Sequence, residues 1–267
     1  MPGLWRPFNP PIRTWTGQRV WVIGASSGIG RAAAVQLIDA GATVFASARS
    51  ERSLSTLVSD HSEPDAPPRA QAWPMDVTDA ASVAATARAL LDQGPVDLVL
   101  FCAGHYRALR ADGFDLSEMQ GHMAINYGGA LHVIDAVLPA FLERGHGHLS
   151  LVSSVAGFRG LPKGLAYGPS KAALTHLAET LYLDLAGKGI GVSVVHPGFV
   201  KTPLTAQNDF EMPALMSPEA AARELLAGLA RGDFEIHFPR RFTRWMKLMR
   251  LLPYRAYFPL VHRATGL

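Results

Sequence analysis

Three side chains in the middle of the chain have the types and spacing needed for proton transfer at a carbonyl oxygen. Tyr167 and Lys171 stand at positions i and i+4, so a helix places them on one face, and Ser154 precedes them. A free tyrosine, with a pKa of about 10, exchanges protons poorly near neutrality. We expect the Lys171 ammonium to favour the tyrosinate and Ser154 to hydrogen-bond a substrate oxygen. The set predicts acid–base chemistry on a carbonyl; the alternative is an ordinary pair on a helix surface.

A glycine-rich loop near the start of the chain is typical of a phosphate site. It lies between a predicted strand at 19–23 and a predicted helix at 31–40. Glycine permits a tight turn and close approach of the backbone, and the helix start offers free N–H groups to an anion. A nucleoside-triphosphate loop is disfavoured because no Gly-Lys-Ser/Thr follows. The residues expected to hold a dinucleotide here are Gly24, Ser26, Ser27, Gly28, Ile29 and Gly30.

The end of the second predicted strand bears on the choice of cofactor. An acidic residue there would accept hydrogen bonds from the ribose of NAD, and none is present. Arg49 can instead pair with a 2′-phosphate, with Ser47 and Ser50 as weaker donors. We therefore predict NADP(H) as the preferred cofactor and NAD(H) as the alternative, unless Arg49 is only a solvated residue at a helix start. Asp76 is placed to accept a hydrogen bond from the adenine amino group, or else serves as a turn residue.

Apolar strands alternate with helices along the chain, which predicts an α/β fold, a doubly wound parallel sheet with helices on both faces. Strands are expected at 19–23, 42–46, 70–75, 96–101, 148–153, 190–195 and 234–238. Helices are expected at 31–40, 79–92, 116–144 in two segments, 167–186 and from Ser217 onward. Residues 60–68 form a polar, proline-rich connection. Ligands of such sheets bind beyond the carboxyl ends of the strands, where the predicted site residues fall.

Composition excludes several classes of protein. The chain has 267 residues, of which 48 % are hydrophobic, enough for a sizeable core. A net charge of +3 gives no indication of nucleic acid as a partner. Its one cysteine, Cys102, cannot form an internal disulfide, which suits a reducing compartment. We expect a cytoplasmic protein, since no signal sequence and no run of about 18 apolar residues is apparent.

The combined motifs resemble the short-chain dehydrogenase/reductase family from about residue 17 to about residue 205. They are residues 24–30, Asp76-Val77, Cys102-Ala103-Gly104, Asn126, Ser153-Ser154, residues 167–171 and Pro197-Gly198. The resemblance implies a Rossmann sheet, a nicotinamide cofactor and a catalytic set of Asn126, Ser154, Tyr167 and Lys171. By the same resemblance, the backbone of Asn126 holds a water, Lys171 binds the nicotinamide ribose and Thr202 grips the carboxamide. It adds Val77, Ala103, Gly104, Pro197, Gly198 and Val200 to the cofactor site, and it implies a homo-dimer or homo-tetramer built from the long helices.

Two positions depart from the family pattern. Ile23 stands where a threonine usually precedes the first glycine, and Phe101-Cys102 replaces a common Asn-Asn. The lost polar groups usually brace the sheet, so we expect an effect on local stability rather than on chemistry. The four-residue step from Tyr167 to Lys171 also argues against an enoyl reductase.

The substrate site is expected to be apolar. The segment 199–216 contains Phe199 and Leu204 and is predicted to close over the substrate, with His105 at the mouth beside Tyr106 and Arg159. The alternative is a loop that packs its own side chains. No metal site is predicted, and His146 and His148 are interpreted as turn residues.

Three parts of the chain are predicted. Residues 1–16 form an irregular arm on the surface, residues 17–238 the catalytic domain and residues 239–267 a basic, aromatic-rich tail. The tail can pack on its own domain, on a partner subunit or on a membrane surface. Packing on protein is favoured, and peripheral membrane contact is the alternative.

The function predicted from these residues is NADP-dependent hydride transfer between the nicotinamide and a small-molecule ketone or secondary alcohol. A 3-oxoacyl or sphingoid-type lipid ketone reductase is a narrower alternative, because the basic tail suits an acyl carrier or lipid. A non-catalytic nucleotide sensor or scaffold is the alternative of another class, although a pure binder does not need the Ser/Tyr/Lys set.

Overall fold

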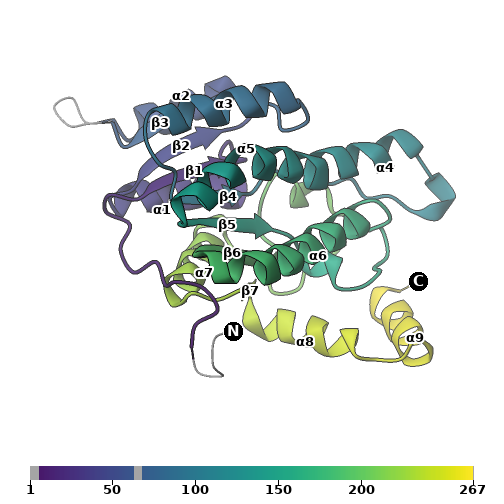
Figure 1. The fold of residues 1–267 in the computed structure, drawn as a ribbon. Helices are drawn as coiled ribbons and strands as arrows, with labels where there is room; N and C mark the ends of the chain where they lie inside the picture. Colours follow the sequence, from purple (N-terminus) through teal and green to yellow (C-terminus); the bar gives the residue numbers. More distant parts are fainter. Residues whose placement is uncertain (1–5, 63–67, 267) are drawn as a thin grey trace.

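Seven parallel strands form one sheet in the computed structural model, which describes residues 6–62 and 68–266 (Figure 1). The strand order is β3-β2-β1-β4-β5-β6-β7. The strands are β1 (Arg19–Ile23), β2 (Thr43–Ser47), β3 (Ala70–Ala72), β4 (Leu98–Phe101), β5 (Gly147–Val152), β6 (Ile190–Pro197) and β7 (Glu235–Phe238). The order reverses between β1 and β4, which is where ligands of such sheets bind. The predicted doubly wound α/β fold is confirmed.

Helices cover both faces of the sheet. One face carries α1 (Gly28–Asp39), α2 (Glu51–Ser59) and α7 (Pro218–Arg231), and the other carries α3 (Ala80–Asp92), α5 (Gly129–Arg144) and α6 (Tyr167–Leu185). Successive side chains of β1 point to opposite faces, so Val20 and Val22 pack in the first layer and Trp21 and Ile23 in the second. Short 3-10 turns lie at Ala111–Gly113, Val155–Gly157, Ala186–Lys188 and Thr205–Gln207.

Local chemistry explains where several elements begin and end. The Asp79 carboxylate accepts hydrogen bonds from the backbone N–H groups of Ala81 and Ser82 and begins α3, as predicted. Ser217 caps α7 in the same way, with Pro218 in the first turn. β3 ends at Ala72 rather than at residue 75, although the N–H groups of Trp73 and Met75 still donate to the carbonyls of Ala46 and Ala48 beside it.

The described part of the arm, residues 6–16, is irregular but does not lie wholly on the surface. Asn9 is only 3 % exposed. Its amide donates to the carbonyl of Val192 at 2.8 Å and accepts from the N–H of Val192 at 2.9 Å. β7 begins opposite Val194, so Val192 has no strand partner on that side and Asn9 supplies the hydrogen bonds. Residues 1–5, and residues 63–67 of the predicted proline-rich connection, lie outside the described residues.

The prediction that His148 is a turn residue is wrong. His148 lies inside β5, buried, with its Nε2 2.8 Å from the hydroxyl of Ser193. Burial lowers the pKa of His148 to about 4, so the ring is neutral and structural.

A continuous helical stretch runs from α4 (Leu116–Met123) through a π-helical turn (Ala124–Gly128) into α5. By length and composition it is apolar enough to cross a membrane, although the sequence predicted no such segment. Its α5 part buries Ala130, Val133 and Phe141 in the core. A helix of a protein core can have the same length and apolar composition, so packing on the sheet explains the apolar face of α5.

The tail forms two helices, α8 (Arg240–Arg250) and α9 (Tyr254–Thr265), separated at Pro253. They lie at the edge of the molecule, below the sheet in Figure 1. Thr243 of α8 and Tyr257 and Val261 of α9 are buried, so one side of each helix packs on the chain's own domain.

Candidate active site

A cavity of about 270 Å³ opens where β1, β4, β5 and β6 end. The loops after these strands and the start of α6 form its walls, as expected for a doubly wound sheet. Most of the predicted site residues line it: Gly24, Ser26, Ser27, Gly28, Ile29, Gly30, Ala103, Gly104, Ser154, Tyr167, Lys171, Pro197, Gly198, Phe199, Val200, Thr202 and Leu204. Five predicted residues do not line it, namely Arg49, Asp76, Val77, His105 and Asn126.

The glycine loop forms a cradle that no larger residue could build. Gly24 has a φ of +91°, and a Cβ there would lie 2.6 Å from the backbone nitrogen of Ala103. A Cβ on Gly30 would lie 2.3 Å from the carbonyl oxygen of Gly24. Ser27 begins α1 without a side-chain capping bond, and the first turn holds no acidic residue. The N–H groups of that turn are therefore available to an anion, and the cradle fits a phosphate.

Ser154, Tyr167 and Lys171 meet at the other end of the cavity. Ser154 follows β5, and its hydroxyl accepts a hydrogen bond from the N–H of Ala156 at 3.1 Å. Tyr167 is the first residue of α6. One turn later, the ammonium of Lys171 lies 5.7 Å from the centre of the Tyr167 ring and donates to the carbonyl of Val152 at 2.9 Å.

The electrostatics of this set differ from the sequence prediction. Burial raises the pKa of Tyr167 to about 12, and the hydroxyl of Ser154 acts in the opposite direction. Burial lowers the pKa of Lys171 to about 8. The prediction that Lys171 makes the phenol acidic is not met in this structure, because its ammonium is directed at Val152 and the desolvation of a phenolate dominates.

The lowered pKa of Lys171, about 8, predicts a pH-dependent contribution to stability. The unfolded chain keeps an amine pKa of about 10.4, so it binds more protons than the folded chain between pH 8 and pH 10. The free energy of unfolding of the wild type should therefore rise with pH, relative to Lys171→Met, by about 2 kcal/mol across that window. Urea denaturation of both proteins at each pH measures the difference, and a constant difference would contradict the assignment.

The residues predicted for the adenosine end lie outside the cavity. Arg49 is exposed beyond β2, and no acidic side chain of residues 6–62 or 68–266 forms an ion pair with it. Asp76 accepts hydrogen bonds from the N–H and the hydroxyl of Thr78, at 2.9 and 2.8 Å, and the backbone bond lowers its pKa. Val77 is buried against Gly129 and packs in the core.

The two serines near Arg49 have other partners. The hydroxyl of Ser47 accepts a hydrogen bond from the indole of Trp21 at 2.9 Å, in the core. Ser50 caps α2 by accepting from the N–H of Ser53. The expectation that these serines add donors for a 2′-phosphate is therefore wrong for Ser47 and unsupported for Ser50.

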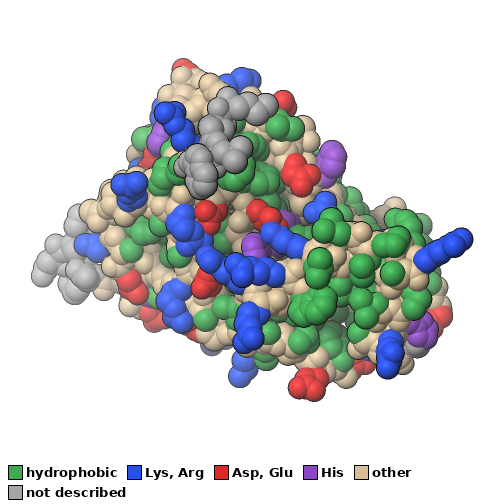
Figure 2. Space-filling model, turned by 90° about the horizontal axis from the view of Figure 1, so that it is seen from below, with side chains coloured by type: hydrophobic (Ala, Val, Ile, Leu, Met, Phe, Trp, Pro, Cys, Tyr) green, Lys and Arg blue, Asp and Glu red, His purple; other side chains and the backbone are tan. Residues whose placement is uncertain are grey.

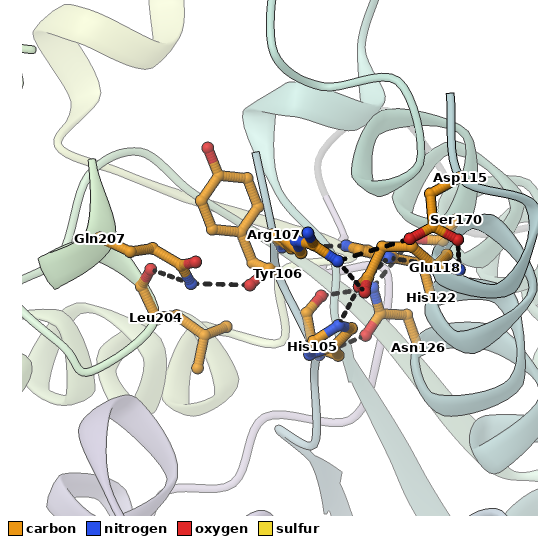
Figure 3. A network of polar contacts seen from close by, with 10 residues as sticks. All are labelled: His105, Tyr106, Arg107, Asp115, Glu118, His122, Asn126, Ser170, Leu204 and Gln207. Atoms are coloured by element: carbon orange, nitrogen blue, oxygen red, sulfur yellow. Dashed lines mark hydrogen bonds and ion pairs between the residues drawn. The ribbon is translucent and has the colours of Figure 1, made fainter. Parts of the chain in front are cut away.

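His105 does not point into the cavity, contrary to the prediction for the substrate site (Figure 3). Its imidazole pairs with the carboxylate of Glu118 on α4. Its backbone is held by Asn126, whose amide oxygen accepts from the His105 N–H at 2.6 Å and whose Nδ2 donates to the His105 carbonyl at 3.0 Å. Nδ2 of Asn126 also donates to the hydroxyl of Ser170 at 2.9 Å. Asn126 thus joins the π-helical turn to the loop after β4 and to α6.

His105, Glu118 and His122 bring three potential metal ligands together, although the sequence predicted no metal site. Nδ1 of His122 donates to the carbonyl of Glu118 at 2.8 Å, and its Nε2 accepts from the N–H of Arg107 at 3.1 Å. The guanidinium of Arg107 lies 3.1 Å from the Glu118 carboxylate. Both nitrogens of His122 are therefore engaged and a cation already neutralises Glu118, so the cluster is a hydrogen-bonded brace (Figure 3).

Tyr106, a residue of the cavity wall, contacts the ring of Tyr167. Its ring meets the ring of Tyr167 edge to face at 5.0 Å, and its hydroxyl donates to Asn208 at 3.0 Å. Gln207 donates to the Tyr106 carbonyl at 2.7 Å, which ties the segment 199–216 across the cavity (Figure 3). The sequence placed Tyr106 only at the mouth, because its contact with Tyr167 depends on tertiary packing. Asn208 was not predicted at all.

Arg159 was also expected at the mouth, but it holds the tail. Its guanidinium donates to the carbonyls of Met249 and Leu252, at 3.2 and 2.5 Å, where α8 ends. It also lies 4.5 Å from the ring centre of Tyr254 and 4.0 Å from that of Tyr257. These cation–π contacts and hydrogen bonds fix α8 and α9 on the domain.

A polar chain, partly exposed at Lys247 and Glu235 and buried at His196 and Thr175, joins the tail to α6. Lys247 of α8 lies 2.5 Å from Glu235 of β7, and Glu235 lies 3.0 Å from Nδ1 of His196. Nε2 of His196 lies 3.0 Å from the hydroxyl of Thr175, which is 3.0 Å from the carbonyl oxygen of Lys171. Burial alone would raise the pKa of Glu235, but hydrogen bonds from His196 and Lys247 bring this pKa down to about 2.

Comparison with known proteins agrees with this geometry. The short chain dehydrogenase family matches residues 18–212. An uncharacterized oxidoreductase of Myxococcus xanthus is 40 % identical over 233 residues, covering 87 % of this chain and 91 % of that protein. A short-chain dehydrogenase from Streptomyces avermitilis is 27 % identical with a TM-score of 0.80, covering 94 % of this chain and 98 % of that one.

A solved structure with a bound cofactor is also similar to this chain in sequence and fold. It is a short chain dehydrogenase from Burkholderia cenocepacia in complex with NADP, 25 % identical with a TM-score of 0.80, covering 93 % of this chain and 98 % of that chain. The family match over residues 18–212 spans the glycine loop, the Ser/Tyr/Lys set and strands β1 to β6. The chain therefore belongs to the short-chain dehydrogenase/reductase family and is an oxidoreductase that acts on CH–OH groups.

Proposed function

We propose that the protein is an NADP(H)-dependent oxidoreductase that interconverts a ketone and a secondary alcohol, with Tyr167 as the general acid and base. The observation that carries this proposal is that Ser154, Tyr167 and Lys171 line the same cavity as the phosphate cradle. A proton donor and a hydride carrier must both reach one carbonyl group, and both the Ser/Tyr/Lys set and the phosphate cradle open onto this cavity.

The residues of the chain divide the work as follows. A bound nicotinamide would supply or accept the hydride. Tyr167 would protonate the substrate oxygen during reduction and remove the proton during oxidation, while Ser154 holds that oxygen. Lys171, which lines the same cavity, would bind the nicotinamide ribose. Asn126 would hold the water that connects Lys171 to bulk solvent.

We assign further residues to the two ends of a bound NADP(H), its nicotinamide carboxamide and its adenosine. Thr202 lies against the cradle, since a Cβ on Gly28 would come within 2.8 Å of its methyl group. This position suits the proposed contact of Thr202 with the carboxamide. Arg49, exposed beyond β2, would pair with the 2′-phosphate of NADP(H), and Asp76 would accept from the adenine amino group. NAD(H) is the weaker cofactor in this proposal.

An apolar ketone is the proposed substrate class. Phe199, Leu204 and Phe210 line the cavity, and apolar atoms make up most of its wall. A 3-oxoacyl or sphingoid-type lipid ketone is the narrower candidate that this wall favours. The proposed catalytic domain is 17–238, with residues 1–16 as an arm and residues 239–267 as a tail; residues 6–16 and 239–266 of these extensions pack on it.

We further propose a cytoplasmic homo-dimer or homo-tetramer formed through α5 and α6. Leu131 and Leu142 of α5 and Leu183 of α6 are exposed large apolar residues, which suit such an interface.

Cofactor consumption against ketones of increasing chain length tests the proposed function. With NADPH we expect turnover that rises with chain length until the cavity is filled, and weaker turnover with NADH. The proposed function would be contradicted if the protein bound NADPH but reduced no ketone, and bound NADP but oxidised none of the matching alcohols.

A further inference from the structure

The outer side of α8 and α9 is an exposed apolar surface, which we call the tail face. Hydrophobic side chains gather there, with Lys and Arg side chains around them (Figure 2). Trp245 is 63 % exposed and Leu251 is 80 % exposed. The apolar residues of the tail face are Trp245, Leu248, Leu251, Tyr254, Phe258 and Leu260. An exposed apolar patch with a polar rim is typical of a surface that binds a protein, a membrane or a ligand.

The tail face is held rigidly from behind. Tyr257 is buried, and its hydroxyl donates to the carbonyl of Gly160 at 2.8 Å. Arg159 binds the end of α8, and Lys247 pairs with Glu235. Packing on the chain's own domain therefore uses the inner side of both helices and leaves the outer apolar residues uncovered in this chain.

The charge of the tail selects the partner. No Asp or Glu occurs between Glu235 and the end of the sequence, whereas this segment contains seven Lys and Arg residues. Lys247 pairs with Glu235 and Arg240 with Glu224. The other five have no acidic partner within residues 6–62 and 68–266: Arg241, Arg244, Arg250, Arg255 and Arg263. The tail face therefore needs an anionic partner that also accepts apolar side chains.

A symmetric contact between two copies of this chain fits poorly. A two-fold interface places the same patch on both subunits, so it would bring two sets of unpaired arginines together. A lipid bilayer meets both requirements, because anionic headgroups lie directly above an apolar layer. Trp, Tyr and Arg are the side chains that bridge these two layers. We infer that the tail face docks α8 and α9 onto an anionic membrane surface.

Docking would connect the membrane to the wall of the cavity. Phe242 of α8 lies 5.7 Å, between ring centres, from Phe199, and Phe199 lies 5.7 Å from Phe210. Both Phe199 and Phe210 line the cavity. A lipid-soluble ketone could then reach the cavity from the bilayer; this extension depends on the proposed function, whereas docking itself does not.

Vesicle flotation of the full-length protein tests the docking. We expect binding to vesicles of phosphatidylcholine mixed with phosphatidylglycerol, little binding to phosphatidylcholine alone, and release by salt. The double variant Trp245→Asp/Leu248→Asp should lose binding. Phe114→Asp, which alters an aromatic side chain that is 60 % exposed outside the tail, should bind as the wild type does. Arg241→Ser/Arg244→Ser should bind about thirtyfold more weakly, since each cation near such a surface contributes about fivefold.

Two further measurements separate the alternatives. Turnover of a short, water-soluble ketone should be unchanged in both tail variants, which shows that they are folded and that a loss of binding is not a loss of the proposed activity. Tryptophan emission should shift to shorter wavelength on vesicle binding in the wild type but not in Trp245→Phe. Failure of the folded wild type to bind anionic vesicles would overturn the inference. So would dissociation of an oligomer by Trp245→Asp/Leu248→Asp with vesicle binding intact, because the tail face would then be a protein interface.

Discussion

The Tyr167→Phe variant is expected to turn over its ketone about 10²–10⁴-fold more slowly than the wild type, the usual contribution of a positioned general acid. Phenylalanine keeps the ring that contacts Tyr106 but removes the hydroxyl that faces Ser154. The phosphate cradle is formed by a different segment, so NADPH binding should remain within about twofold of the wild type. Steady-state kinetics and a fluorescence titration with NADPH measure the two quantities separately.

Tyr182→Phe provides a matched control on the same helix. Its hydroxyl donates to the carbonyl of Phe8 at 3.0 Å, away from the cavity. We expect its turnover to equal that of the wild type. Equal turnover in Tyr167→Phe would refute the proposed role of the phenol, and a parallel loss in both variants would point to helix stability instead.

Replacing Arg49 with alanine should lower kcat/KM for NADPH about tenfold to a hundredfold and leave kcat/KM for NADH nearly unchanged. A hydrogen bond to a charged group contributes about 1.5–3 kcal/mol, and each 1.4 kcal/mol corresponds to a factor of ten. Arg49 is exposed beyond β2 and forms no ion pair with an acidic residue of the described chain, so its guanidinium is available to a 2′-phosphate. Parallel kinetics with both cofactors give the ratio.

Arg52→Ala is the matched control, since Arg52 is also exposed and lies in the first turn of α2. Its ratio of kcat/KM values for the two cofactors should stay that of the wild type. If Arg49→Ala leaves the ratio unchanged, the arginine is only a solvated residue and the preference for NADP(H) has lost its basis. If Arg52→Ala changes the ratio equally, the effect belongs to the general charge of this region.

The parts of the site that were predictable from sequence are those set by local spacing. The glycines of the cradle must stand between a strand and a helix, and Tyr167 and Lys171 are one helical turn apart. The parallel sheet then brings the ends of β1, β4, β5 and β6 to one edge without further information. For this reason, the residues after these strands could be assigned to one cavity before the structure was known.

The parts that could not be predicted depend on partners distant in sequence. Asn9 bonds Val192 across 183 positions, and no local pattern marks either residue. His105 was assigned to the mouth of the cavity, but its ring pairs instead with Glu118 on α4. The electrostatic prediction failed for a related reason, because the direction of the Lys171 side chain is decided by the carbonyl of Val152.

The polar chain from Lys247 through Glu235, His196 and Thr175 makes the tail part of the scaffold beneath the catalytic helix. Deleting residues 239–267 would remove Lys247, the cation that pairs with Glu235, and would leave the Glu235 carboxylate facing only the buried imidazole of His196. That strain would pass to the turn of α6 that carries Lys171. The shortened enzyme would therefore turn over even water-soluble substrates more slowly. A loss of activity after such a deletion would say little about membrane binding.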